Sequence, residues 1–146
     1  MRKQDPEVNF HVAGCPREEV SHLFKNWDSQ GYHLSGWCEP EEFYRQIDLL
    51  ILPSKNEPFG MVVAEANATN VPVVISEQCG IAPLINPHQG TALPLDEAAI
   101  SQWMRECKRL INSREDIPSL NLTWPSLAEK HISLYTHLNT HLTTPT

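Results

Sequence analysis

The chain has 146 residues, of which 40% are hydrophobic and 20% charged, and its formal net charge is −7 with neutral histidines. This composition predicts one globular domain with its own core and excludes a disordered chain. Nucleic acid is not an expected partner because the 11 basic residues form no cluster. Neither a signal peptide nor a transmembrane segment is expected, because no long apolar run occurs.

The apolar pattern alternates between short strands and amphipathic helices along the chain. Apolar runs that end at Gly, Pro or polar residues predict strands at residues 8–13, 32–35, 49–52, 73–75 and 91–95. Apolar spacings of three and four predict helices that begin near Pro16, Glu39, Phe59, Asp96 and Ser126, and a helical turn at 82–85. We expect a polar leader at 1–7, the domain at 8–138 and a flexible tail at 139–146.

The same spacing predicts one apolar face on each of three helices. The predicted core positions are Val20, Leu23, Phe24 and Trp27, then Met61, Ala64 and Ala68, and then Ile100, Trp103, Met104, Cys107, Leu110 and Ile111. Asp96 is the expected N-cap of the third of these helices, because its short carboxylate can accept a backbone hydrogen bond there. Such apolar stripes are typical of core packing rather than of a ligand site.

The cysteines and histidines give no strong metal or disulfide signal. The four cysteines are scattered and form no C-x-x-C pair, so we expect reduced thiols, as in a cytosolic protein, with a disulfide or metal site as the alternative. His137 and His141 are four residues apart and His131 lies upstream, so they could bind a metal, although a solvated surface is the expected reading.

The stretch 48–84 predicts a strand, a helix and a second strand joined by short loops, which is the unit of a parallel α/β sheet. Glu57 lies in the loop at the carboxyl end of the first strand, where open parallel sheets bind ligands. Glu65 lies about two turns into the helix. The first helical turn, 59–62, has free backbone N–H groups that suit phosphate or hydroxyl oxygens.

The run E-P-F-G-M-V-V-A-E-A at 57–66 closely resembles the donor-binding signature of retaining glycosyltransferases of the GT-B fold, family-four type. P-V-V-I-S at 72–76, with C-G behind it, is similar to the next segment of that signature. H-V-A-G at 11–14, L-S-G at 34–36 and the segment 124–135 resemble further parts of the family in the expected order. The resemblance implies an α/β fold, a Rossmann-like parallel sheet flanked by helices, and specifically an incomplete C-terminal half of a GT-B fold.

The resemblance also implies roles for individual residues. Glu57 would be the catalytic carboxylate beside the donor sugar, and Glu65 would accept hydrogen bonds from the ribose hydroxyls. The other implied donor-binding residues are Phe59, Gly60, Met61 and Val62, with Gly36 and Trp37 at the base. No metal and no other cofactor is expected. The alternatives are that Glu57 only caps the helix, that Glu65 is a solvated surface acid, and that Trp37 anchors a loop.

Two parts of the family pattern are missing. These are the N-terminal acceptor-binding domain and the first strand-helix unit of the C-terminal domain, which carries an Arg and a Lys that hold the donor diphosphate. Lys55 lies near the site but is expected at the surface. Without the central strand, its two neighbours should expose unpaired backbone groups, which favours association with another segment or marginal stability.

The sequence also departs from the family pattern at two asparagines, and the resemblance implies partners. Asn70 replaces a usual glycine and tolerates the left-handed conformation, whereas Asn67 replaces a common Met with no clear effect. We expect a cytoplasmic protein, or one peripheral at the inner membrane face, that binds a nucleotide-sugar and is inactive alone. It would need a separate acceptor-binding domain or would self-associate through the open sheet. The alternative is a non-catalytic remnant or subunit, and an NAD-binding domain is disfavoured because A-G-C-P lacks the G-x-G-x-x-G turn.

Overall fold

A computed structural model describes residues 7–27 and 29–113 of the chain. The predicted helix after Ser126, the three histidines from His131 onward, the flexible tail and most of the leader lie outside the described residues. The strands are β1 (Phe10–Ala13), β2 (Tyr32–Gly36), β3 (Leu50–Leu52), β4 (Val73–Ser76) and β5 (Gly90–Leu93). The helices are α1 (Arg17–Val20), α2 (Pro40–Tyr44), α3 (Met61–Ala68) and α4 (Ile100–Asn112), with 3-10 turns at Ser21–Phe24, Ala82–Leu84 and Glu97–Ala99.

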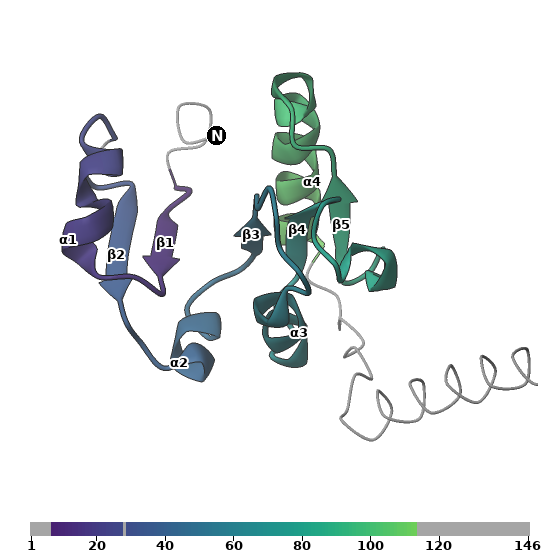
Figure 1. Cartoon of the computed structure of the whole chain (residues 1–146), viewed down its shortest axis with the longest axis horizontal. Helices are drawn as coiled ribbons and strands as arrows, with labels where there is room; N and C mark the ends of the chain where they lie inside the picture. The colour runs from purple at the N-terminus through teal and green to yellow at the C-terminus, as the bar shows by residue number, and fades with distance from the viewer. Residues whose placement is uncertain (1–6, 28, 114–146) are drawn as a thin grey trace, which may run out of the picture.

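The strands form two parallel sheets. β1 pairs with β2, and β3, β4 and β5 form a second sheet in that order. Figure 1 shows the two sheets apart, with β1 and β3 as the strands that face each other. The α/β class and the parallel pairing are confirmed, and each of the five predicted strands is present to within two residues at either end.

Among the described residues, the sheet is interrupted between β1 and β3, as expected. The amide of Leu50 donates to the Pro72 carbonyl at 2.9 Å, and that of Phe10 to Gly31 at 3.0 Å. Because alternate residues of a parallel strand direct their backbone groups to opposite sides, the N–H and C=O groups of Ile51 and His11 point to the outer edges. Among the described strands, none pairs with those two edges.

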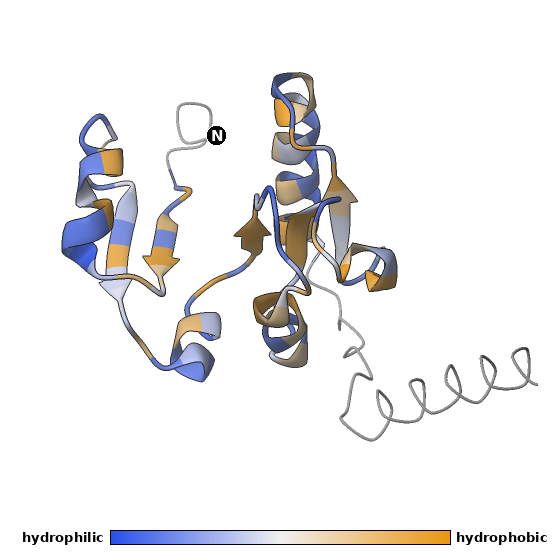
Figure 2. Cartoon of the chain, in the orientation of Figure 1, coloured by the Kyte–Doolittle hydropathy of each residue, from blue (hydrophilic) through white to orange (hydrophobic). Residues whose placement is uncertain are grey.

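The core lies on both faces of the three-stranded sheet. On the α3 face, Val63 and Ala66 pack with Val73 and Ile75 of β4. On the α4 face, Cys107 and Leu110 pack with Val74 and Leu93. Figure 2 shows β3 and β4 as apolar strands and much of α1 as polar, so the larger sheet carries most of the hydrophobic stabilisation.

The predicted face of the central helix is confirmed only at Ala64, which is half-buried against the core. Met61 is 52% exposed and Ala68 is also exposed, whereas Val63, Ala66 and Asn67 are buried. Positions 63, 66 and 67 are separated by three and four residues, so they form a face of their own, rotated from the predicted one. Because the run 61–68 is apolar nearly all round, its periodicity could not select between the two faces.

The first predicted helix is shorter and more exposed than its pattern suggests. α1 covers one turn and passes into the 3-10 turn at Ser21–Phe24, and neither segment contains a buried residue. Leu23 is 62% exposed, although Phe24 and Trp27 do make an edge-to-face ring contact. A 3-10 turn has three residues per turn, so the side chains lose the α-helical spacing. Two strands also offer little surface to cover.

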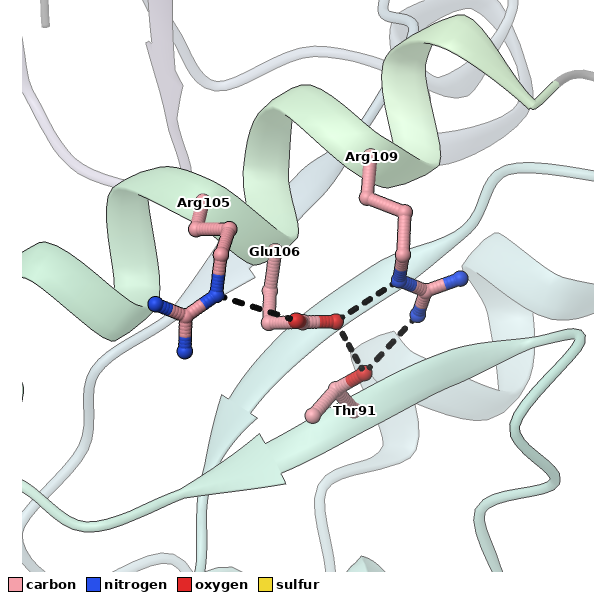
Figure 3. A network of polar contacts seen from close by, with 4 residues as sticks. All are labelled: Thr91, Arg105, Glu106 and Arg109. Atoms are coloured by element: carbon pink, nitrogen blue, oxygen red, sulfur yellow. Dashed lines mark hydrogen bonds and ion pairs between the residues drawn. The ribbon is translucent and has the colours of Figure 1, made fainter.

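The helix after Asp96 behaves as predicted at its beginning and along most of its face. The backbone N–H of Ala99 donates to Asp96 Oδ1 at 2.8 Å, which confirms the N-cap. Ile100 is an exception, since it is exposed at the first turn. Farther along, Glu106 accepts hydrogen bonds from Arg109 at 2.8 Å and from the Thr91 hydroxyl at 3.3 Å, which ties α4 to β5 (Figure 3).

Candidate functional site

The loop between β3 and α3 is held against the loop that follows β4. The amide of Gly80 donates to the Glu57 carbonyl at 2.9 Å, and the amide of Ile81 donates to Phe59 at 2.8 Å. A Cβ atom on Gly80 would lie 2.0 Å from the Pro58 carbonyl oxygen, so only glycine allows the two backbones to approach this closely. The main chain around Glu57 is therefore fixed by its neighbours.

Gly60 makes the sharp entry into α3. Its φ of +96° lies in the left-handed region, and an added Cβ would be 2.6 Å from the Cys79 sulfur. No side chain caps α3, and no described group accepts a hydrogen bond from the N–H of Met61 or Val62. These donors and the positive end of the helix dipole suit an anionic oxygen. Phe59 is half-buried against the α3 core.

Glu57 lies in a loop whose main chain is tied to the loop after β4. Its backbone forms a bridge with Cys79 and its carbonyl accepts from the Gly80 amide, but its half-buried carboxylate makes no hydrogen bond or ion pair with another described residue. The alternative that Glu57 only caps the helix is wrong, because Gly60 is the N-cap residue and α3 has no side-chain cap. Lys55, in the same loop, is exposed as expected.

Glu65 is not a solvated surface acid. The Tyr44 hydroxyl lies 3.0 Å from Glu65 Oε2 and 3.1 Å from the Val62 carbonyl oxygen, so Tyr44 can donate to either. Tyr44 is only 5% exposed, and its burial together with the adjacent carboxylate raises the pKa of the phenol well above its usual range. No local pattern in the sequence predicts the contact of Tyr44 with Glu65, because the two residues are 21 positions apart.

The structure gives a mixed result for the residues expected at the base. Gly36 is buried at the end of β2 with a φ of +73°, and its carbonyl accepts from the Gly14 amide at 2.9 Å. Trp37 is 77% exposed, so the alternative that it anchors a loop is wrong. The base contact of Gly36 and Trp37 stays a prediction.

Two asparagines that replace other residues of the family pattern have structural roles. Asn70 has a φ of 59°, which confirms the left-handed conformation expected after α3. Asn67 is fully buried, and its amide nitrogen donates to the Val71 carbonyl at 3.0 Å. Asn67 therefore links the end of α3 to the start of β4, a role that the sequence analysis left open.

The described residues contain neither a metal-site cluster nor a membrane-spanning helix. In residues 7–27 and 29–113, no cluster of three or more His, Cys, Asp or Glu side chains has the arrangement of a metal site. The same ranges contain no helix with the length and apolar character needed to span a membrane. All four cysteines are free thiols, as expected. An apolar pocket of about 280 Å³ between Ile51 and Trp103 contains none of the predicted donor-binding residues.

The chain is similar to several known glycosyltransferases. It is 31% identical over 156 residues to a D-inositol 3-phosphate glycosyltransferase of Corynebacterium diphtheriae, covering 92% of this chain and 36% of that protein. It is 29% identical over 114 residues to a probable transglycosylase of Burkholderia thailandensis, covering 77% of this chain and 30% of the relative. The chain thus spans about a third of the length of these relatives.

Solved structures show the same fold at low sequence identity. A mutant of TarM from S. aureus, in complex with fondaparinux, α-GlcNAc-glycerol and UDP, superimposes with a TM-score of 0.72 at 20% identity, over 92% of this chain and 30% of TarM. Sucrose-phosphate synthase from Thermosynechococcus elongatus gives a TM-score of 0.69 at 20% identity, over 94% of this chain and 40% of the synthase. Both likenesses support an α/β fold of the GT-B type.

The sequence model of one family, described as glycosyl transferases group 1, matches residues 1–113. That match includes β1 through α4 and therefore the loop of Glu57 and the helix of Glu65. The expected relation to GT-B glycosyltransferases is confirmed, and the chain belongs to the group 1 glycosyl transferases.

Proposed function

We propose that this chain is the donor-binding part of a retaining glycosyltransferase and binds a nucleotide-sugar between the 53–60 loop and the start of α3. The observation that carries the proposal is the placement of Glu57 on a loop fixed by Gly80 and Ile81, directly before a helix N-terminus with free N–H groups. Glu65 follows two turns along the same helix. A TarM structure that contains UDP supports the same class of ligand.

The chemistry follows from where each group lies. Phosphate oxygens would accept from the N–H groups of Met61 and Val62, with Gly60 allowing close approach. The Glu57 carboxylate would face the sugar and stabilise the positive charge that develops on its ring during transfer. Glu65 would accept from the two ribose hydroxyls, and Gly36 with Trp37 would contact the base. No step of this proposal uses a metal ion, because the free N–H groups at the start of α3 would bind the diphosphate oxygens.

We also propose that the described part is inactive without a second polypeptide segment. In a GT-B enzyme the acceptor-binding domain forms the other wall of the active site. The open edges of β1 and β3 offer backbone groups to a further strand, through which a separate acceptor-binding protein or a second copy could attach. In the loop 53–60, Lys55 is the one cation, so diphosphate binding by this part should be weak. A cytoplasmic location remains our expectation.

Calorimetric titration with UDP-, GDP- and ADP-sugars tests donor binding. We expect heat with at least one of them, and a weaker titration with Glu65→Gln, while Glu97→Gln, a distant exposed acid, serves as the control. If none of the sugars binds to a chain that a cooperative unfolding transition shows to be folded, the proposal is wrong.

A non-catalytic remnant or subunit is the second candidate, because the open sheet leaves the fold incomplete among the described residues. Co-expression with an acceptor-domain protein, followed by a glycosyl-transfer assay on the purified complex, separates the two candidates. Transfer that depends on both chains and disappears with Glu57→Gln supports the donor-binding proposal. If every complex with an acceptor-domain protein binds the donor but shows no glycosyl transfer, the result supports the non-catalytic remnant.

A further inference from the structure

The hydrogen bond between Tyr44 and Glu65 connects two elements that are distant in sequence. Tyr44 is the last residue of α2 and lies 21 positions before Glu65 in α3. Its hydroxyl lies 3.0 Å from Glu65 Oε2 and 3.1 Å from the carbonyl of Val62 in the first turn of the same helix. The phenol thus contacts both the acid and the helix turn whose N–H groups are free.

We propose that Tyr44 is a positioning residue that orients the Glu65 carboxylate for recognition of a pair of neighbouring hydroxyls, as in a ribose. This inference rests on the proposed donor-binding function and adds a residue to it. Tyr44 itself does not touch the ligand, because it is 5% exposed.

A glutamate side chain that is not held by a neighbour is flexible. A glutamate has three rotatable side-chain bonds, so a free carboxylate loses rotamer entropy when it binds a ligand. Tyr44 occupies one acceptor position on Oε2 and leaves Oε1 and a second position on Oε2 open. A vicinal diol needs two acceptor positions on one carboxylate, and the remaining oxygens supply them.

The second step concerns the environment of the phenol. Tyr44 packs in the α3 core with Val63 and Ile81, so its ring cannot move away without leaving a cavity. Burial and the neighbouring carboxylate keep the phenol protonated far above neutral pH, so it remains a donor. Glu65 is therefore held by a rigid donor on one side and open on the other.

The consequence is a specific effect on hydroxyl recognition. Without the phenol hydroxyl, Glu65 can adopt other rotamers. A ligand that binds both carboxylate oxygens of Glu65 then loses more affinity than a ligand that binds only one. We expect Tyr44→Phe to weaken binding of a ribonucleoside diphosphate about three- to tenfold, the usual effect of one hydrogen bond, and to leave the 2′-deoxy analogue nearly unchanged.

The experiment compares UDP, GDP and ADP with their 2′-deoxy counterparts by calorimetry on the whole chain. The ratio of the two Kd values is measured for the wild-type protein, Tyr44→Phe, Glu65→Gln and the double variant. Tyr32→Phe is the matched control, because Tyr32 stacks on Phe24 in the first sheet and its hydroxyl makes no hydrogen bond within the described residues. Thermal unfolding verifies that each variant is folded.

Loss of ribose preference in Tyr44→Phe, with no further loss in the Glu65→Gln background, supports the inference. An equal drop in affinity for the ribose and deoxyribose forms would assign Tyr44 a purely structural role and overturn it. Unchanged affinities in Tyr44→Phe overturn it as well. If the wild-type chain binds nucleotides without any preference for ribose, only this inference fails, whereas no binding at all removes the proposed function on which it rests.

Discussion

Replacing Gly60 by alanine should destabilise the protein through two separable effects. The first is conformational, because Gly60 has a φ of +96°, which L-residues rarely adopt. The second is steric, because the new Cβ would lie 2.6 Å from the Cys79 sulfur and 3.2 Å from Ile81 Cγ2. Both neighbours are buried, so neither can move aside freely.

The magnitude follows from the two contributions. A left-handed conformation costs a residue with a Cβ about 1–2 kcal/mol. Forcing a methyl group into a packed site costs about 1–3 kcal/mol more. Gly60→Ala should therefore lower the free energy of unfolding by about 2–5 kcal/mol, a large part of the ~5–15 kcal/mol of a typical domain.

Gly14→Ala is the matched control for the conformational effect. Gly14 has a similar φ of +89°, but an added Cβ would meet nothing within 4 Å. Gly14→Ala should lower the free energy of unfolding by about 1–2 kcal/mol. Both variants share the small stabilisation that comes from a less flexible unfolded chain. The difference between the two variants then measures the steric effect alone.

Urea unfolding monitored by circular dichroism gives the free energies if the transition is two-state. We expect Gly60→Ala to lose at least about 1 kcal/mol more than Gly14→Ala. A chain that no longer folds with Gly60→Ala but folds with Gly14→Ala agrees with this order. Equal losses for the two variants would refute the argument that the contact with Cys79 decides the identity of residue 60.

Three further predictions concern α4 and the thiols. The hydrogen bond from Arg109 lowers the pKa of Glu106, so this network (Figure 3) stabilises the fold above the usual pKa of 4.5 and loses its effect as pH falls through the lowered value. Glu106→Gln should remove that pH dependence in urea titrations and cost about 0.5–1 kcal/mol at pH 7, and an unchanged pH profile would contradict it. Burial raises the pKa of Cys107 to about 11, so its thiol should react with a thiol reagent at pH 8 only when the chain unfolds. The exposed Cys38 should react at once. Rapid labelling of Cys107 in the folded chain would argue against the packing of α4. Asp96→Ala should lower the free energy of unfolding by about 1 kcal/mol because the N-cap hydrogen bond is lost, and Asp96→Asn should lower it much less. Equal melting temperatures of the two variants would contradict this prediction.

Local patterns were sufficient for most of the elements and for the positions of the two glutamates along the chain. The apolar runs around Ile51 and Val74 predicted buried parallel strands because a strand covered on both faces needs continuous apolar residues. Glu57 and Glu65 could be placed on a loop and on the following helix because turn residues and helical spacing are short-range signals. The open edges of β1 and β3 were expected only from the resemblance to the GT-B family, whose central strand has no counterpart before β1 in this sequence.

Only the tertiary structure decided which atoms meet across the chain. It selected Val63 and Ala66 instead of Met61 for the core, because an apolar run without a polar side has no preferred face until a sheet covers it. It also placed Tyr44 on Glu65, 21 positions later, and Gly80 against Pro58. These contacts depend on how α2 and the two loops pack onto the three-stranded sheet, and spacing along one helix or one strand contains no information about such distant neighbours.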